Sequence, residues 1–135
     1  HSNIILFTRL GARVRVIAPD FLMPEKFPVE GVEKFTSMEE GLSGCDLVMM
    51  LRNQKERMNA DLIPNDATFF RLFGLTPERL RLANPEALVM HPAPMNRGVE
   101  IADEVADDPA RSVIFEQMKN GVPLRMAVLD LLING

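Results

Sequence analysis

The stretch LVMMLRNQKER, residues 47–57, decides how this chain is expected to fold. Five apolar residues follow a Gly-Cys-Asp turn and give way to six polar or charged ones. A short apolar run without alternation is typical of a strand buried on both faces in a parallel sheet that helices cover. Such sheets bind ligands just beyond the carboxyl ends of their strands. Because Arg52, Asn53 and Gln54 fall at that position and carry many hydrogen-bond donors, we expect half of a site for a small anion there.

Composition limits the class of protein. The 135 residues are the length of one ordinary domain, and the 47% that are hydrophobic are enough for a core. Fifteen basic against 19 acidic residues give a net charge of -4, without a run of Lys or Arg, so nucleic acid is not an expected partner. The single cysteine, Cys45, suits a reducing compartment. No apolar run reaches the roughly 18 residues of a membrane span, and we expect a cytoplasmic location without a membrane partner.

Periodicity and capping residues predict alternating strands and helices. The expected elements are a helix at 1–10, strands at 12–18 and 32–35, a helix at 37–42 with Ser37 as N-cap, the strand at 47–51, a helix after the N-cap Thr76, and a strand at 87–90. Residues 68–73 fit a strand or a helix. Asn120-Gly121 is expected to break the chain, and Pro123 to begin a helix that ends at Leu132 or Ile133.

Most other charged residues are interpreted as solvated. Arg13 and Arg15 share one face of the strand at 12–18, which favours a face in water. An acidic cluster beside Arg111 is interpreted in the same way, and it consists of Glu100, Asp103, Glu104, Asp107 and Asp108. The two His and one Cys are scattered without the spacing of metal ligands, so no metal site is expected.

A second strand end carries the segment HPAPMNRG, residues 91–98. Its two prolines remove backbone N–H groups and hold the chain extended, which leaves the carbonyls of Pro92 and Ala93 as outward acceptors for an ammonium or an amide. A stiff turn that merely leaves the sheet is an equally good interpretation of this segment alone. His91 fits a structural histidine better than a catalyst, because the sequence pairs no Ser or Cys nucleophile with it.

The helices expected at 1–10 and 122–133 carry apolar residues around much of their circumference. A domain of this size can seldom cover such helices itself, so an exposed apolar face, covered by a missing domain or an oligomer, is predicted. The chain also starts at His1 inside a helical pattern that has no capping residue before it. We therefore expect it to be a fragment.

Three segments together resemble the aspartate-binding half of the aspartate carbamoyltransferase family: VMMLRNQKERM at 48–58, FGLT at 73–76 and HPAPMNRGVEI at 91–101. The last segment is long and ordered, which makes the resemblance specific. It implies an α/β fold in three layers, with a mainly parallel, Rossmann-like sheet flanked by helices. Residues 1–135 would then form one aspartate-binding domain, with its terminal helices 1–10 and 122–133 packed on an absent carbamoyl phosphate domain.

The resemblance also implies roles for particular residues. Substrate-binding residues would be Arg52, which holds a carboxylate of L-aspartate, Gln54, which helps to place the substrate, and Pro92 and Ala93, whose carbonyls receive the attacking amine or the carbamoyl NH₂. Glu56 would pair with Arg52, and Arg57 would reach toward the other domain on closure. Neither a cofactor nor a covalent intermediate is implied.

Much of the family's machinery has no counterpart here. The Ser-Thr-Arg-Thr loop, the catalytic histidine and the lysine from a neighbouring subunit belong to the carbamoyl phosphate domain. This chain alone is therefore expected to be inactive. The resemblance implies that the intact protein transfers a carbamoyl group from carbamoyl phosphate to L-aspartate in pyrimidine biosynthesis, and that it is a homotrimer or a multiple of it.

Two alternatives remain open. One is a non-catalytic relative that serves as an assembly scaffold, and the other is a transcarbamylase for another amine such as ornithine. Arg52 and the segment at 91–100 argue against ornithine, because a cationic side chain prefers acidic partners. A dinucleotide-binding module is weaker still, since the chain lacks a Gly-rich turn between strand and helix.

Overall fold

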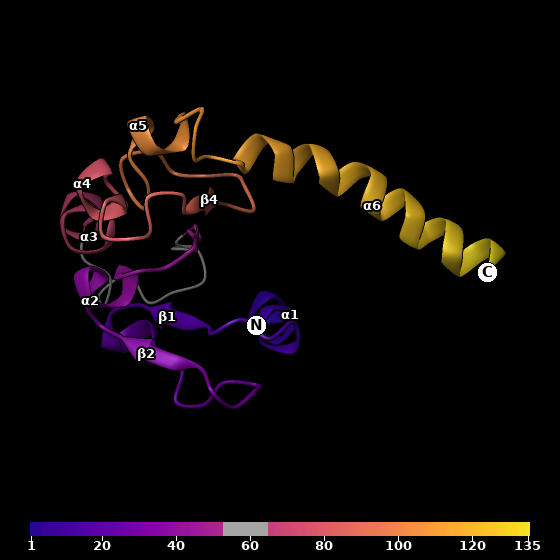
Figure 1. Ribbon diagram of the computed structural model, residues 1–135, viewed down its shortest axis with the longest axis horizontal. Coiled ribbons are helices and arrows are strands. Elements are labelled where there is room, and N and C mark those ends of the chain that lie inside the picture. Colours follow the sequence, from indigo (N-terminus) through magenta and orange to yellow (C-terminus); the bar gives the residue numbers. More distant parts are fainter. Residues whose placement is uncertain (53–64) are drawn as a thin grey trace.

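The computed structural model describes residues 1–52 and 65–135. Strands and helices alternate along them (Figure 1), in the order α1 (Ser2–Arg9), β1 (Arg15–Ile17), the 3₁₀ helix η1 (Asp20–Leu22), β2 (Glu33–Phe35), α2 (Met38–Leu42), β3 (Leu47–Met49), α3 (Asp66–Phe73), α4 (Pro77–Leu80), β4 (Leu88–Met90), α5 (Asp103–Ala106) and α6 (Ile114–Asn134). The expected α/β class is confirmed.

The strands form two short parallel pairs. In one pair β1 lies beside β2, and in the other β3 lies beside β4 with Val48 opposite Val89. Residues 111–113 extend the second pair along the other edge of β4, where Val89 N–H donates to the Arg111 carbonyl (2.8 Å) and Val113 N–H to the Val89 carbonyl (3.0 Å). These bonds fix the start of α6 against the sheet.

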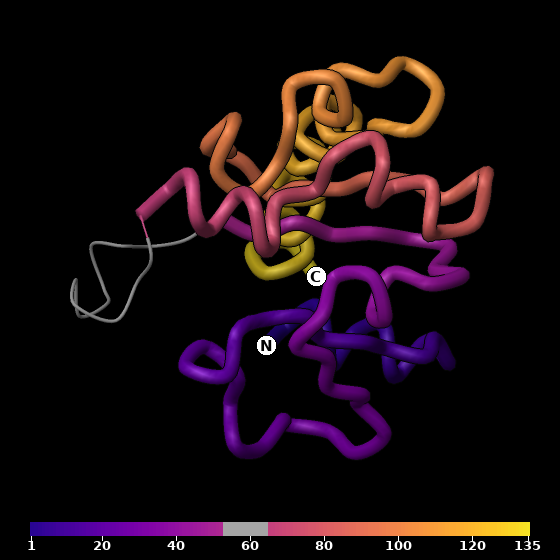
Figure 2. The backbone as a smooth tube through the Cα atoms, turned by 90° about the vertical axis from the view of Figure 1, so that its left-hand side faces the viewer, coloured from indigo at the N-terminus to yellow at the C-terminus, as the bar shows by residue number. Residues whose placement is uncertain are grey.

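Helices lie on both sides of the strands. Figure 1 shows α2, α3 and α4 to the left of the strands, and α1 with most of α6 to the right. In the view turned by 90° (Figure 2), the indigo and purple first third of the chain lies below the remainder. This arrangement matches the three layers that the resemblance implies.

The core lies between the strands and the helices α2 to α5. Its largest fully buried apolar side chains are Leu42, Leu75, Val89, Ile101, Val105 and Ile114. Within β3 and β4 only the central Val48 and Val89 are buried, so burial on both faces is wrong for the remaining positions of these two strands. Met49 is half-buried and accepts a hydrogen bond at its Sδ from Asn3 Nδ2 of α1 (3.1 Å).

Two capping predictions are confirmed. Ser37 Oγ accepts the Glu40 N–H (3.3 Å) at the start of α2, and Thr76 Oγ1 accepts the Arg79 N–H (3.4 Å) at the start of α4. The ambiguous residues 68–73 are helical, because Asn65 Oδ1 caps the Thr68 N–H (2.8 Å) and begins α3 one turn before the apolar run.

The expected break at Asn120-Gly121 is wrong. Helix α6 runs without interruption from Ile114 to Asn134 and holds Pro123 inside it. Gly121 does not adopt the positive φ that an Asn-Gly turn needs. With its first turn hydrogen-bonded to β4, the helix continues past the one backbone bond that Pro123 removes.

The exposed apolar face predicted for the terminal helices is confirmed. On α1 and its end it includes Leu6 and Leu10, and on α6 it comprises Val122, Leu124, Met126, Val128, Leu129, Leu131, Leu132 and Ile133. We call this set the α1/α6 face. Among the described residues, no helix combines the length and apolar character that crossing a membrane requires.

The solvated interpretation holds for Arg13 but not for Arg15. Arg13 forms an exposed ion pair with Glu33. Arg15 is largely buried, donates to the carbonyls of Gly41 (3.1 Å) and Ser43 (2.7 Å), and lies over the Phe35 ring. Those carbonyls belong to the second half of α2 and the residue after it, so Arg15 ties the end of this helix to β1.

Candidate functional site

Two strand ends meet at one edge of the sheet. The pairing of β3 with β4 continues one residue further, because the Met50 N–H donates to the Met90 carbonyl (2.9 Å). Arg52, which is half-buried, lies two residues beyond this pairing on the side of β3, and the turn at residues 91–96 begins directly after it on the side of β4. The structure brings Arg52, Pro92 and Ala93 to the same edge, whereas Asn53, Gln54, Glu56 and Arg57 lie outside the described residues.

The turn at residues 91–96 has an unusual backbone. Ala93 has a φ of 52°, in the left-handed region that residues other than glycine seldom occupy, and the Ala93–Pro94 peptide bond is cis. The Ala93 N–H donates to His91 Nδ1 (2.9 Å). Across residues 1–52 and 65–135, no group donates a hydrogen bond to the carbonyl oxygen of Pro92 or of Ala93. Within the described part of the chain, both oxygens therefore keep their acceptor capacity.

His91 is fully buried below this turn. Since Nδ1 accepts from Ala93, the ring hydrogen lies on Nε2, which donates to Glu100 Oε1 (3.2 Å). The backbone N–H of His91 donates to Gln117 Oε1 of α6 (3.1 Å). With each nitrogen of the residue partnered inside the protein, His91 has the structural role that its sequence context favours.

Glu100 corrects the interpretation of the acidic cluster. Instead of lying in water it is 1% exposed, and its Oε1 accepts from both His91 Nε2 and the Asn96 N–H (2.5 Å). Pairing with residue 75 brings it inside, because Leu75 N–H donates to the Glu100 carbonyl (2.9 Å) and Ala102 N–H to the Leu75 carbonyl (3.0 Å). The available sequence signal was its place in the apolar run Val-Glu-Ile-Ala.

Two other members of the acidic cluster, Asp103 and Asp107, are exposed and pair with Arg97. Arg97 donates to Asp103 (2.8 Å) and to Asp107 (2.7 Å), which connects the end of the turn to α5. The hydrogen bond from Arg97 lowers the pKa of Asp107, and the two carboxylates raise the pKa of Arg97. Arg111 instead donates to the carbonyls of Ala87 and Asn84 (both 2.9 Å), away from the acidic residues.

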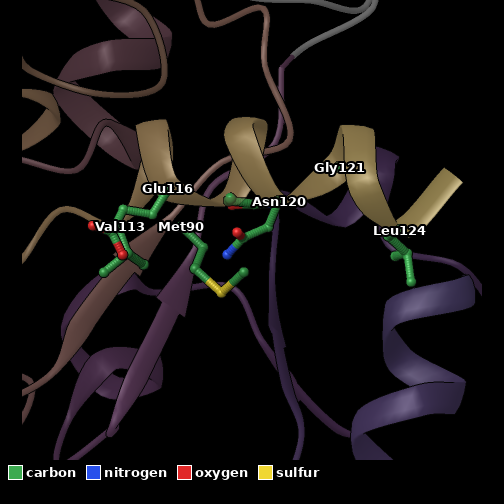
Figure 3. A pocket seen from close by; sticks show the side chains of 7 residues that line it. Met90, Val113, Glu116, Asn120, Gly121 and Leu124 are labelled. Atoms are coloured by element: carbon green, nitrogen blue, oxygen red, sulfur yellow. The ribbon is translucent and has the colours of Figure 1, made fainter. Parts of the chain in front are cut away.

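A hollow of about 370 Å³ lies along α6 (Figure 3). It is lined by Met90, Val113, Glu116, Gln117, Asn120, Gly121 and Leu124. Its walls are mostly apolar and it opens on the α1/α6 face. Leu124 belongs to the α1/α6 face, while Met90 ends β4 and Gln117 accepts the His91 N–H, so the hollow lies between that face and the candidate site.

Metal ligands are not gathered in the described part of the chain. Residues 1–52 and 65–135 contain no group of three or more His, Cys, Asp or Glu side chains placed to hold an ion. The polar groups at the strand ends are a guanidinium and two carbonyls, which suit an organic molecule that carries a carboxylate and an amine.

The sequence matches known carbamoyltransferases over nearly its whole length. It is 59% identical over 131 residues to the aspartate carbamoyltransferase catalytic subunit of Methylorubrum populi, and 53% identical to that of Maricaulis maris. Each match covers 97% of this chain and 41% of the relative. The chain thus spans about two fifths of the length of these curated relatives.

Solved structures share the fold. Ornithine carbamoyltransferase from Pyrococcus furiosus superposes with a TM-score of 0.86 at 26% identity, over 100% of this chain and 46% of that one. Aspartate transcarbamoylase from Trypanosoma cruzi, in complex with carbamoyl aspartate and phosphate, superposes with a TM-score of 0.69 at 29% identity, over 86% of this chain and 39% of that one. Residues 1–132 also match the family described as aspartate/ornithine carbamoyltransferase, Asp/Orn binding domain. The chain belongs to the aspartate/ornithine carbamoyltransferase family, of which it carries the Asp/Orn binding domain.

Proposed function

We propose that the intact protein transfers a carbamoyl group from carbamoyl phosphate to L-aspartate, a step of pyrimidine biosynthesis, and that this chain supplies the aspartate-binding half of the site. The observation that carries the proposal is the parallel pairing of β3 with β4, because Arg52 follows the end of one strand, and Pro92 and Ala93 follow the end of the other. The relatives at 53–59% identity, all named as aspartate carbamoyltransferase catalytic subunits, support it.

The proposed carbamoyl transfer depends mainly on how the two substrates are positioned. The amine of aspartate attacks the carbonyl carbon of carbamoyl phosphate, the bond from that carbon to the phosphate oxygen breaks, and the amine loses a proton as phosphate leaves. Arg52 holds a substrate carboxylate through two parallel N–H donors. The Pro92 and Ala93 oxygens accept from the amine or from the carbamoyl NH₂. Holding the two reactants in line removes most of the entropic barrier.

Three residues outside the described ranges complete this half of the site in the proposal. Gln54 contacts the substrate beside Arg52. Glu56 pairs with Arg52 and fixes its orientation, and Arg57 reaches toward the other domain as the enzyme closes. These roles follow from the resemblance of the segment 48–58 to the family.

Aspartate is preferred to ornithine as the substrate. Aspartate presents a second carboxylate to Arg52, whereas the second amine of ornithine would bring like charge to the same guanidinium. The strong superposition on an ornithine carbamoyltransferase concerns the fold, because the sequences are only 26% identical. The alternative is tested by comparing turnover of the two amino acids by the same protein.

The rest of the enzyme is expected to cover the α1/α6 face. The relatives have more than twice the length of this chain, and in the proposal the carbamoyl phosphate domain packs on α1 and α6 and supplies the phosphate-binding groups. The proposed intact protein is a cytoplasmic homotrimer or a multiple of it, and this chain alone does not turn over. Carbamoyl transfer by the purified 135-residue chain would disprove the proposal that turnover needs the second domain.

Arg52→Ala in the intact protein tests the proposed site. Loss of a charge-assisted clamp should lower kcat/KM for aspartate on the order of 10²-fold. Arg81→Ala is the matched control, because Arg81, the residue after α4, is exposed and pairs only with the exposed Glu78 among the described residues. An Arg52 variant within a few-fold of the unmodified protein would remove this residue from the site.

A further inference from the structure

A buried pair, Glu100 and His91, lies beneath the turn that holds the proposed acceptor carbonyls. We propose that Glu100 is a positioning residue for the transfer: through His91 and the Asn96 N–H it sets the direction of the Pro92 and Ala93 carbonyl oxygens. The inference rests on the proposed function, and it assigns to the acidic side chain a role in distinguishing the nitrogen groups of the substrates.

One carboxylate oxygen ties both ends of the turn. Oε1 of Glu100 accepts from Nε2 of His91 (3.2 Å) at the start of the turn and from the N–H of Asn96 (2.5 Å) at its end. The opposite ring nitrogen of His91 accepts the Ala93 N–H (2.9 Å). The carboxylate is therefore connected through a single imidazole to the backbone of the residue whose carbonyl is a proposed acceptor.

The backbone at Ala93 needs this support. A φ of 52° places its Cβ against its own backbone, so an alanine leaves this conformation unless other contacts hold it. Without Glu100, Nε2 of His91 and the Asn96 N–H lose their acceptor, and the turn can relax toward ordinary φ values. The carbonyl oxygens then move, and a displacement of about 1 Å can cost about 10²-fold in rate.

The stability of the fold does not by itself explain why a carboxyl group, that of Glu100, is buried here. The second oxygen, Oε2, is buried and accepts no hydrogen bond from the described residues. Burying an acceptor without a partner costs free energy that an apolar side chain would avoid. The backbone of Glu100 is itself held by Leu75, so the carboxyl group is a fixed point from which the turn is positioned.

The test uses the intact protein and compares each substrate with an analogue that lacks the group carrying the reacting or hydrogen-bonding nitrogen. Succinate is aspartate without its amine, and inorganic phosphate is carbamoyl phosphate without its carbamoyl group. Glu100→Ala should lower kcat/KM for aspartate and reduce the preference for aspartate over succinate, or for carbamoyl phosphate over phosphate, each on the order of 10-fold. Glu100→Gln, which retains an oxygen for both donors, should restore most of the preference.

Controls separate positioning from folding. Glu104→Ala removes an exposed carboxylate four residues away and should leave both preferences unchanged. If Glu100→Ala does not fold, His91→Asn tests the same link, because the Asn oxygen can still accept the Ala93 N–H but no longer reaches Glu100. Reduced preference in a folded variant supports the inference, whereas equal weakening of all four ligands, or unchanged preferences, overturns it. An unmodified protein that does not turn over aspartate would refute the proposed function itself, before any variant is made.

Discussion

The segment at residues 91–102 and the second half of α6 are both rich in apolar residues, yet one of them buries such side chains and the other exposes them. In the first region Ile101 and Ala102 are buried, and backbone hydrogen bonds tie the segment to Leu75. In the second, residues 122–133 expose nearly every apolar side chain. Apolar content alone therefore does not define the core of this chain. Long-range hydrogen bonds position the turn, while the far part of α6 is bonded mainly along itself.

Leu75→Ala should give the largest effect, because Leu75 is fully buried at the point where the segment 100–102 is anchored. Removing its side chain leaves a cavity and should lower the free energy of unfolding of the intact protein by about 2–5 kcal/mol. Chemical denaturation measures this change in the free energy of unfolding. Leu82→Ala, at an exposed leucine, is the control and should cost less than about 1 kcal/mol. Equal costs would mean that the turn is not anchored through Leu75.

The second prediction concerns Leu132, which is 78% exposed on α6. In the 135-residue chain, Leu132→Asp should change the free energy of unfolding by no more than about 0.5 kcal/mol. An exposed apolar face should bind a hydrophobic dye, so the substitution should also lower the fluorescence of such a dye. Low dye binding and a clean monomeric sedimentation profile of the unmodified chain would contradict an exposed face. In the intact protein the same change should be costly, since the proposed second domain covers Leu132.

Local signals in the sequence predicted the elements on which the site depends. Ser37 and Thr76 stand immediately before the helices they cap, and the apolar runs at 47–51 and 87–90 contain β3 and β4. Arg52, Pro92 and Ala93 could be assigned to one sheet edge, since parallel strands end together. The exposed α1/α6 face followed from helices that are apolar around their circumference.

Features set by distant parts of the chain could not be predicted in this way. Glu100 is buried because its backbone pairs with Leu75, 25 residues earlier, and its side chain reaches His91. Arg15 is held by the carbonyls of Gly41 and Ser43, which no local pattern on β1 reveals. At Asn120-Gly121 the turn signal was strong, but the fixed start of α6 on β4 favours an unbroken helix.

The smallest expected effect is a pH dependence at Asp107, where the turn meets α5. The hydrogen bond from Arg97 lowers the pKa of Asp107 in the folded protein, so the unfolded chain binds the proton more tightly. Its contribution to stability is therefore complete above the unfolded value, about 3.9, and is lost as pH falls through the lower folded value. Asp107→Asn should reduce stability at neutral pH, and its difference from the unmodified protein should vanish in acid. Unfolding monitored by circular dichroism between pH 7 and 2 measures this, with Glu104→Gln as the control. Because the Arg97–Asp107 pair is exposed, added salt should reduce the difference in stability between the variant and the unmodified protein. If that difference persists at low pH, the contact with Arg97 does not depend on the charged carboxylate.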